Sequence, residues 1–536
     1  MDKPRRAASE PPGTQEGLVT TISAAETAQD ARHWWESPWF LALVVLCTML
    51  PLIYPPIPPL IDLFGHMGRY RVELDLHHSP WLRQYFDYHW AAIGNLGVDI
   101  LVLALGPIMG LEPAVKLIVL LIPPMTAIGF LWVSREVHGR VVPSAFLALP
   151  FIYGFPFQFG FVNFTLSVAF AFLAFGLWLR LGRLDRTVVR EWAFVPISLL
   201  IFFTHTYGWG LLGLMCFSAE AVRLHDRGRT WWHAGLEAAL RTSVMALPIL
   251  VMLLWRSEAH GGQTYGWFEW NLKWVWIKSA LRDRWMLFDL WSLAVPAAVF
   301  VYAVVNRFFG HTLTLSRNLV FSAMVLTVSF AILPRIVFGS AYADMRLVPY
   351  LMAVGILAIR YRGPEHRKTA NALAAIGLLF FATRTVANTI SLGMAGADQS
   401  AKLQAINVMP EGSRVITLTG MTCSEHWPLL RNSHLGAMVI VRRDGFANDQ
   451  WVIEGVNLLD LKYTAAGYFA ADPSQLVRPN NCRDFLHRQI DQSLAALPRK
   501  DFDYVWLIDV PPYDRSLVAD LPVAWRGPGS ILYRLH

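Results

Sequence analysis

Long apolar stretches alternate with short arginine-bearing loops over most of the chain, and this pattern decides what the chain can fold into. A helix of about 20 apolar residues crosses the roughly 30 Å hydrocarbon core of a bilayer. Of the 536 residues, 54% are hydrophobic and 16% are charged, whereas a typical soluble domain has about 25% charged residues. The sequence therefore predicts a polytopic α-helical membrane protein with about 11–12 membrane segments. These segments are 38–55, 94–110, 113–134, 141–157, 163–180, 192–207, 208–224, 240–256, 288–306, 318–334, 347–361 and 370–391.

The arginine-bearing loops predict the orientation of the segments, because cytoplasmic loops carry an excess of Lys and Arg. The net charge of +7 is concentrated in these loops, so it does not indicate binding to nucleic acid. Three predicted segments separate the basic N-terminal tail from the first arginine-bearing loop, so the two would lie on opposite sides of the membrane if every segment crossed it. One of 94–110 and 113–134 should therefore be re-entrant or interfacial. Asp99 makes 94–110 the weaker crossing. The loops are 135–140, 180–190, 223–241, 307–317 and 360–368.

Composition divides the chain into three parts. Residues 1–35 are polar and lack a signal-peptide pattern, so we expect a disordered cytoplasmic tail. Residues 36–391 form the predicted transmembrane domain, and its first external loop spans 56–93. Residues 392–536 have the composition of a soluble α/β domain, which the loop pattern puts on the extracytoplasmic, periplasmic side.

The C-terminal part contains no nucleotide-binding or hydrolase motif, so we assign it no chemistry. Its cysteines, Cys423 and Cys482, can form a disulfide if the domain is extracytoplasmic, and no cysteine spacing in the chain is typical of a metal site. Short apolar runs bounded by turn residues predict its strands, and helical spacing predicts one helix. We predict strands at 413–419, 437–441 and 503–509, an edge strand at 530–535, and a helix over 482–496.

The proline-rich stretch 55–70 directly follows the first apolar segment. Its prolines end that helix, and a new helix can begin near Leu60. Asp62, His66 and Arg69 then fall at i, i+4 and i+7, on one helical face. Because apolar residues flank Asp62, its carboxylate should be partly desolvated, and a desolvated carboxylate at a membrane boundary favours a functional role.

In this setting the chain resembles the GT-C superfamily of integral-membrane glycosyltransferases, which use sugars carried on polyprenyl phosphates. The resemblance covers residues 36–391 in architecture. A first helix is followed at once by an external loop with Asp62 in an Asp-x-x-x-His pattern, and two interfacial helices follow in that loop. The basic turn 135–140 and a trailing soluble domain are also similar. Asn163 stands where several relatives have an acid.

The resemblance implies transfer of a sugar from a polyprenyl-phosphate-linked donor to a glycan, lipid or protein acceptor. Asp62 would act as general base. His66 would orient Asp62 or contact phosphate. Arg346 would bind the phosphate bidentately, or else pair with Asp344. The membrane would be a bacterial-type inner membrane, with lipid as a further partner.

The resemblance also implies substrate contacts for residues elsewhere at the external boundary. His205 would contact the donor, or it would be a satisfied histidine at a helix end. Arg69 would contact substrate or extend to the lipid headgroups. Asn163 and Asp344 complete this set, and His260 lies in a Gly- and aromatic-rich loop that could close over a sugar. An amide at Asn163 and the missing Asp-x-Asp pattern give a divalent metal no support.

Three other functions compete with this interpretation. A transporter or flippase would have charges at mid-depth and often inverted repeats, whereas the polar residues here collect at one face. An assembly protein with a periplasmic binding domain is compatible with the sequence. A polymerase or ligase of lipid-linked glycans would normally show a large external loop with paired arginines, which this chain lacks.

Overall fold

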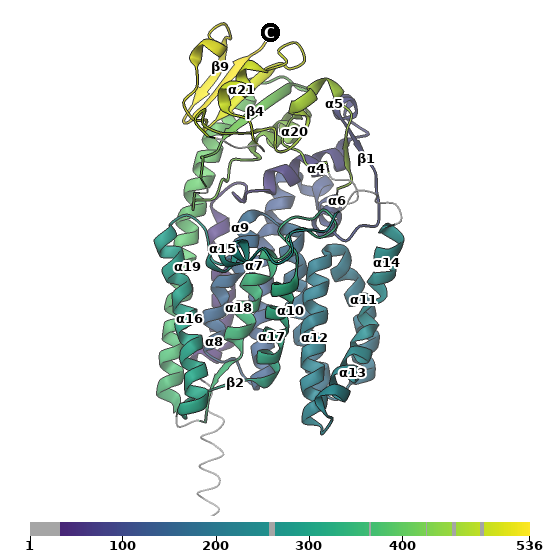
Figure 1. Ribbon diagram of the computed structural model, residues 1–536, viewed down its shortest axis with the longest axis vertical. Helices are drawn as coiled ribbons and strands as arrows, with labels where there is room; N and C mark the ends of the chain where they lie inside the picture. The colour runs from purple at the N-terminus through teal and green to yellow at the C-terminus, as the bar shows by residue number, and fades with distance from the viewer. Residues whose placement is uncertain (1–32, 257–262, 364–365, 425, 453–456, 483–486) are drawn as a thin grey trace, which may run out of the picture.

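The computed structural model describes residues 33–256, 263–363, 366–424, 426–452, 457–482 and 487–536. A bundle of upright helices stands beneath a smaller domain that contains the main sheet and the C-terminus (Figure 1). Most of the predicted tail 1–35 lies outside the described residues, and so does His260.

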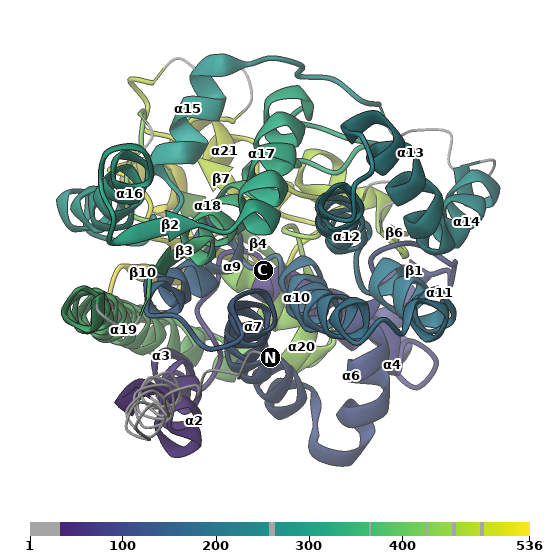
Figure 2. The same ribbon diagram turned by 90° about the horizontal axis from the view of Figure 1, so that it is seen from below.

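Five helices in the described ranges are long and apolar enough to cross a membrane, and a bent pair of helices gives a sixth span if it counts as one. Two of them, α7 and α10, pack against each other near the middle of the bundle (Figure 2). This confirms the predicted helical architecture with several apolar spans. The five are α7 (Leu111–His138), α10 (Val162–Arg183), α11 (Thr187–Thr204), α16 (Met286–Phe309) and α19 (Arg367–Lys402).

Several other predicted segments are shorter or broken helices. The first is divided between α2 (Pro38–Cys47) and α3 (Leu50–Ile53), and prolines follow directly. The helix α6 (Gly97–Met109) has 13 residues and is about 20 Å long, too short to cross alone. The helix α12 (Thr206–Asp226) has 21 residues. The remaining helices of this part are α8 (Ser144–Ala148), η2 (Leu149–Tyr153), α9 (Phe155–Phe159), α13 (Trp231–Thr242), η3 (Ser243–Met245), α14 (Leu247–Arg256), α15 (Trp270–Lys278), α17 (Arg317–Ile332), η4 (Met345–Leu347) and α18 (Val348–Leu357).

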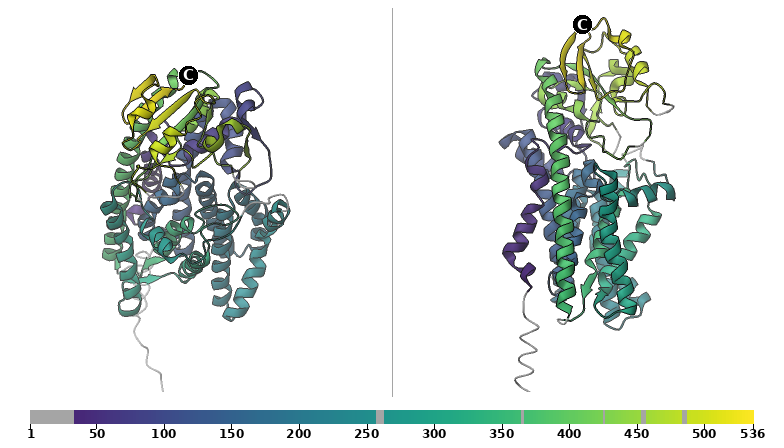
Figure 3. Two further views of the ribbon diagram at one scale, coloured as in Figure 1. Left: turned by 45° about the horizontal axis from the view of Figure 1, so that its top comes forward. Right: turned by 90° about the vertical axis from the view of Figure 1, so that its left-hand side faces the viewer.

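The last helix of the bundle joins the two parts of the molecule. The 36-residue α19 rises the full height of the bundle and enters the C-terminal domain (Figure 3). The predicted boundary between residues 391 and 392 falls inside this helix. A continuous helix is a stiffer connection than a loop, so the C-terminal domain is held in place above the bundle.

The C-terminal domain contains a six-stranded mixed sheet. The order is β5-β4-β8-β10-β9, and β7 also pairs with β4. The strand β4 is parallel to β5, β7 and β8, whereas β10 is antiparallel to both neighbours. The strands are β4 (Arg414–Gly420), β5 (Phe446–Ala447), β7 (Leu476–Val477), β8 (Tyr504–Ile508), β9 (Val523–Gly527) and β10 (Ser530–Arg534).

The predicted strands at 413–419 and 503–509 are confirmed as β4 and β8, and two other predictions for this domain were wrong. The apolar run 437–441 belongs to the buried helix α20 (Met438–Arg443), because a short apolar run does not distinguish a buried helix from a strand. The strand near 530 lies inside the sheet, and β9 forms the edge. The helix predicted over 482–496 is confirmed in part as α21 (Ile490–Ala495), and its residues 483–486 lie outside the described residues.

The loop 56–93, predicted to be external, packs against the C-terminal domain. Its helices are α4 (Leu63–Asp75) and α5 (Pro80–Tyr85), as the sequence predicts. Its strand β1 (Phe86–Tyr88) pairs antiparallel with β6 (Leu459–Leu461). Gly68 lets α4 approach closely, because a Cβ there would lie 2.5 Å from the Gln450 amide nitrogen.

Candidate functional site

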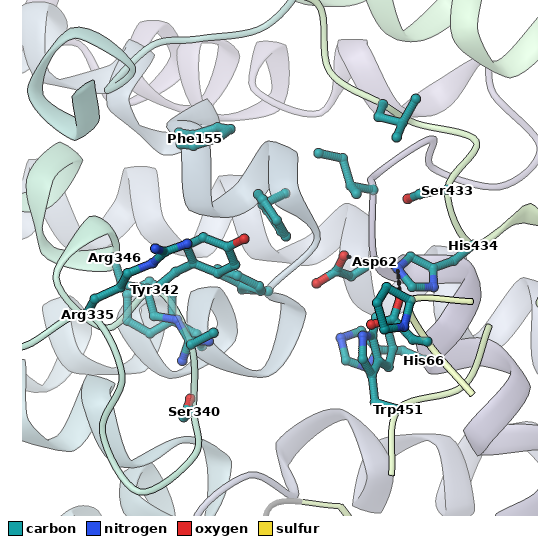
Figure 4. Close-up of a pocket in the computed structure, with 18 of the residues that line it drawn as sticks. Asp62, His66, Phe155, Arg335, Ser340, Tyr342, Arg346, Ser433, His434 and Trp451 are labelled. Atoms are coloured by element: carbon teal, nitrogen blue, oxygen red, sulfur yellow. Dashed lines mark ion pairs between the residues drawn. The ribbon is translucent and has the colours of Figure 1, made fainter. Parts of the chain in front are cut away.

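A cavity of about 990 Å³ lies between the helical bundle and the C-terminal domain. Its walls come from both parts of the molecule. On one side are Asp62, His66, His434 and Trp451, and on the other are Arg335, Tyr342 and Arg346 (Figure 4). A carboxylate and guanidinium groups therefore face the same enclosed space from opposite sides.

The backbone holds Asp62 in place from two directions. Asp62 is the N-cap residue of α4 and comes directly after the proline-rich turn. Its amide donates to the Phe159 carbonyl at 2.9 Å. Gly160 lies against it with φ +97°, and a Cβ there would lie 2.8 Å from the Asp62 nitrogen. The carboxylate is therefore positioned by α9 and the turn after it as well as by its own loop.

The Asp62 carboxylate lies close to the C-terminal domain. The His434 Nε2 is 3.8 Å from Asp62 Oδ1, and the Asp62 side chain is 13% exposed. Burial and the neighbouring Asp472 carboxylate raise the pKa of Asp62 well above its usual range, although Arg346 opposes this shift. At neutral pH the group therefore holds a proton more readily than an ordinary aspartate does.

His66 also lines the cavity, one turn further along α4. Its ring lies 5.1 Å from the Trp451 ring, centre to centre. Burial lowers the pKa of His66, and Arg69 and His434 lower it further. The ring is therefore neutral, and its Nδ1 has no hydrogen-bond partner among the described residues.

Arg346 is a buried cation surrounded by aromatic rings. Its guanidinium carbon lies 4.2 Å from the Phe161 ring centre and 4.9 Å from that of Tyr207. No carboxylate among the described residues forms an ion pair with it, and its Nε has no hydrogen-bond partner there. A buried charge without a counter-charge is costly, so this side of the cavity favours an anion.

His205 adds a second donor beside Arg346. The His205 Nδ1 accepts from the Tyr207 amide at 3.1 Å, so in a neutral ring the proton is on Nε2. That Nε2 lies 3.1 Å from Arg346 Nη1, which can only donate. Two donors thus face each other without an acceptor, and an anion in the cavity would satisfy both.

The remaining lining divides into an apolar part and a loop from the C-terminal domain. The Arg335 guanidinium lies 5.5 Å from the Tyr342 ring centre. Arg282 donates to the Trp427 and His426 carbonyls and so fixes this loop to the bundle. The apolar part of the wall contains Ile93, Phe155, Phe159, Phe161, Val162, Phe164, Met252, Leu272 and Trp276.

Two predicted site residues lie outside the cavity lining, because each pairs with a distant partner. Arg69 forms an ion pair with Asp99 at 2.7 Å and is 4% exposed, so it does not extend to the headgroups. Asp344 pairs with Lys273 at 3.2 Å and accepts from the Met345 amide. Asp344 therefore does not pair with Arg346.

Asn163 lines the cavity, but its amide group is already engaged. Its Oδ1 accepts from the Val98 amide, and its Nδ2 donates to the Asn95 carbonyl and to Asp99 Oδ2. The amide thus ties α10 to the start of α6. Among the described residues no group of three or more His, Cys, Asp or Glu side chains could hold a metal ion.

Sequence reasoning missed the contribution of the C-terminal domain. This domain brings His434, Trp451 and Asp472 into the cavity, although no motif marks them. Only their side-chain types gave a signal, because a histidine and an aspartate in a domain facing the predicted site are candidates for acid–base chemistry. The domain also forms the disulfide that the sequence permitted, between Cys423 and Cys482.

No family model matches the sequence, and no curated protein matches it significantly. Among solved structures, the chain is similar to the crystal structure of ArnT from Cupriavidus metallidurans in the apo state, with a TM-score of 0.49 and 13% identity over 97% of this chain and 98% of that chain. The same protein bound to undecaprenyl phosphate gives a TM-score of 0.46 and 10% identity over 98% and 99% of the two chains.

Proposed function

We propose that this protein is a membrane glycosyltransferase that moves a sugar from a polyprenyl-phosphate-linked donor to an acceptor hydroxyl. One observation carries the proposal. A single cavity holds a buried carboxylate, Asp62, on one side and an unneutralised guanidinium, Arg346, on the other. Transfer from a phosphate-linked sugar needs these two groups, a base for the acceptor and a cation for the leaving phosphate.

The chemistry follows from the positions of the groups. The acceptor oxygen attacks the anomeric carbon of the donor sugar while Asp62 takes the hydroxyl proton. The bond between that carbon and the phosphate oxygen breaks, and its electron pair leaves with the polyprenyl phosphate. Arg346 and the Nε2–H of His205 stabilise the negative charge that develops there. The apolar wall, which includes Phe159 and Trp276, suits the prenyl chain.

The disulfide supports an extracytoplasmic position for the cavity. Disulfides persist in oxidising compartments and are rare in the cytosol. The bond between Cys423 and Cys482 belongs to the domain that closes the cavity, and Met421, Thr422 and Ser424 line the cavity beside it. The reaction would therefore occur on the periplasmic side of an inner membrane.

The test is transfer from radiolabelled polyprenyl-phosphate sugars by the full chain in membranes. We expect Asp62→Asn to lower kcat by roughly 10²- to 10⁴-fold, the range that a general base contributes. Asp75→Asn is the matched control. Asp75 lies on the same loop and pairs with Arg71, but its side chain is 31% exposed, so activity should be unchanged.

Two results would contradict the proposal. Full activity of Asp62→Asn would remove the assignment of the base. Absence of transfer by the wild type from every such donor, with donor translocation measured instead, would favour a transporter or flippase.

A further inference from the structure

We propose that His434 of the C-terminal domain receives the proton that Asp62 takes from the acceptor and passes it to Asp472. This inference rests on the proposed function, because it requires Asp62 to act as a base. His434 would act through Asp62 without touching the substrate, so it is a positioning residue. The C-terminal domain would then complete a proton path that starts in the membrane domain.

The His434 ring lies between two carboxylates. Its Nε2 is 3.8 Å from Asp62 Oδ1 and 4.0 Å from Asp472 Oδ1. Both distances are longer than a hydrogen bond, and long catalytic contacts often tighten when an active site binds its substrate. A single nitrogen atom therefore faces one carboxylate from each part of the molecule.

The contact of the other ring nitrogen determines which tautomer His434 adopts. Its Nδ1 lies 3.0 Å from the Asp449 carbonyl oxygen, which can only accept, so Nδ1 holds the hydrogen. In the neutral ring Nε2 is then a free acceptor aimed at the two carboxylates. The ring is also held against Trp451, at 4.4 Å between ring centres.

Close packing against α4 leaves the His434 ring little room to turn away. A Cβ added at Gly65 would lie 2.5 Å from Trp451 Cη2 and 3.4 Å from His434 Nδ1. The glycine thus lets both rings approach the helix that follows Asp62. The sequence uses its smallest residue at the position where the two domains meet beside the carboxylate.

The last group of the proposed path, Asp472, is the most exposed of the three. The side chains of Asp62 and His434 are 13% and 6% exposed, whereas that of Asp472 is 22% exposed. Asp472 also accepts from the Gln475 amide group, which fixes its orientation. A proton that reaches Asp472 can therefore leave to water, whereas one that stays on Asp62 blocks the next turnover.

The charged groups around the path act on the Asp62 proton in opposite directions, because the Asp472 carboxylate favours a proton on Asp62 whereas Arg346 disfavours it. Arg346 acts on the Asp62 carboxylate from across the cavity, and His66 approaches His434 from α4. The Asp449 carboxylate accepts a hydrogen bond from the Ala437 amide. Burial lowers the pKa of His434, and the Asp472 carboxylate raises it in opposition.

The steps balance in protons and charge. The acceptor O–H bond breaks and an O–H bond forms on Asp62. That bond then breaks as His434 gains a hydrogen on Nε2 and becomes an imidazolium. Transfer from Nε2 to Asp472 restores neutral His434, and release to water restores the Asp472 carboxylate.

The kinetic test compares His434→Gln with the wild type over a range of pH. A glutamine keeps hydrogen bonding but cannot titrate. We expect kcat near neutral pH to fall roughly 10- to 100-fold, less than the full contribution of a base because Asp62 remains, with the donor KM unchanged. Activity should recover as pH rises, because Asp62 then loses its proton directly to water.

Controls separate the relay from general damage. His78 lies in the same loop as Asp62, and its side chain is 81% exposed. The variant His78→Gln should therefore behave as wild type. Added imidazole should restore activity to His434→Ala. Asp472→Asn should give the same pH-dependent loss, and it replaces His434→Gln if that variant does not fold. A loss that is equal at every pH, without rescue by imidazole, would overturn the proposal.

A measurement without turnover distinguishes this inference from the proposed function. Infrared difference spectra of the purified protein, with Asp62→Asn subtracted, report the protonated carboxyl of Asp62 as pH changes. We expect Asp62 to keep its proton to a higher pH in His434→Gln than in the wild type, because the imidazolium no longer stabilises its carboxylate. Identical titrations would overturn the relay even if transfer occurs. A shifted titration without any transfer would leave the proton coupling intact and contradict only the glycosyltransferase.

Discussion

The junction of α4 and α6 and the cavity beside it contain the same kinds of buried charge, but they differ in how that charge is balanced. At the junction, Arg69 and Asp99 meet at 2.7 Å, and Asn163 holds the second oxygen of Asp99. In the cavity, Asp62 and Arg346 remain on opposite sides. Buried ions are stable when paired and costly when separate. The junction therefore serves the fold, and the separation in the cavity supports the binding and catalysis that we propose for it.

The largest expected effect is a loss of stability when the ion pair between Arg69 and Asp99 is broken. Asp99→Asn leaves the Arg69 guanidinium buried without a counter-charge, which should cost about 3–5 kcal/mol of unfolding free energy. Thermal unfolding in detergent measures it. Asp226→Asn removes an exposed pair with Arg317 and should cost less than about 1 kcal/mol.

A second substitution sharpens this result. Arg69→Met in the Asp99→Asn background should recover much of the lost stability, because it removes the unpaired charge. Equal stability of Asp99→Asn and the wild type would show that the pair does not serve the fold, and the contrast with the cavity would be lost.

The intermediate effect is a loss of activity on substitution of Arg346, in the cavity. Arg346→Gln should lower kcat/KM for the donor by about 10- to 100-fold, since hydrogen bonds from a charged group contribute about 1.5–3 kcal/mol. Its unfolding temperature should not fall, because no ion pair is broken. Arg346→Lys should recover only part of the activity, since an ammonium cannot bind phosphate bidentately.

Destabilisation of Arg346→Gln as large as that of Asp99→Asn would contradict this assignment. Arg346 would then be a structural cation like Arg69. An unchanged donor KM and kcat in a stable Arg346→Gln would instead show that Arg346 does not contact the phosphate, and Arg335, which also lines the cavity, would be the next candidate to test.

The comparison also explains what the sequence could and could not predict. Hydropathy predicts the helical bundle because the bilayer requires long apolar helices with internally paired backbones. The apolar neighbours of Asp62 and the prolines before it predict a functional role for this residue, and the structure places it in the cavity lining. The roles of Arg69 and Asp344 were not predictable, because their partners, Asp99 and Lys273, come from other helices.

Local sequence patterns could not predict the place of His434 in the site. It follows Asp62 by most of the length of the chain, in a domain without any motif, and only the packing of α4 against that domain brings the two together. The run 437–441 shows the same limit at the level of secondary structure. Its five apolar residues fit a buried strand or a buried helix equally, and tertiary packing selects the helix.

The smallest expected effect concerns the position of Asp62 and uses two glycines with nearly the same backbone. Gly160 has φ +97° and Gly228 has φ +93°. Alanine at either costs about 1–3 kcal/mol of backbone strain. A Cβ at Gly228 meets nothing within 4 Å, whereas at Gly160 it would lie 2.8 Å from the Asp62 nitrogen.

The two alanine variants share the cost of backbone strain, but only Gly160→Ala must also displace the Asp62 backbone, so it should lose more stability than Gly228→Ala and should differ from it in activity. Gly228→Ala should keep wild-type kcat, whereas Gly160→Ala should shift Asp62 and lower kcat about tenfold, because small displacements of a catalytic group are costly. The donor KM should stay the same, since Arg346 lies on the other side of the cavity. Kinetics and thermal unfolding of the pair measure both quantities. If both variants keep full kcat, then Gly160 is needed only for the backbone turn. The position of the Asp62 carboxylate would then matter less than expected for a general base.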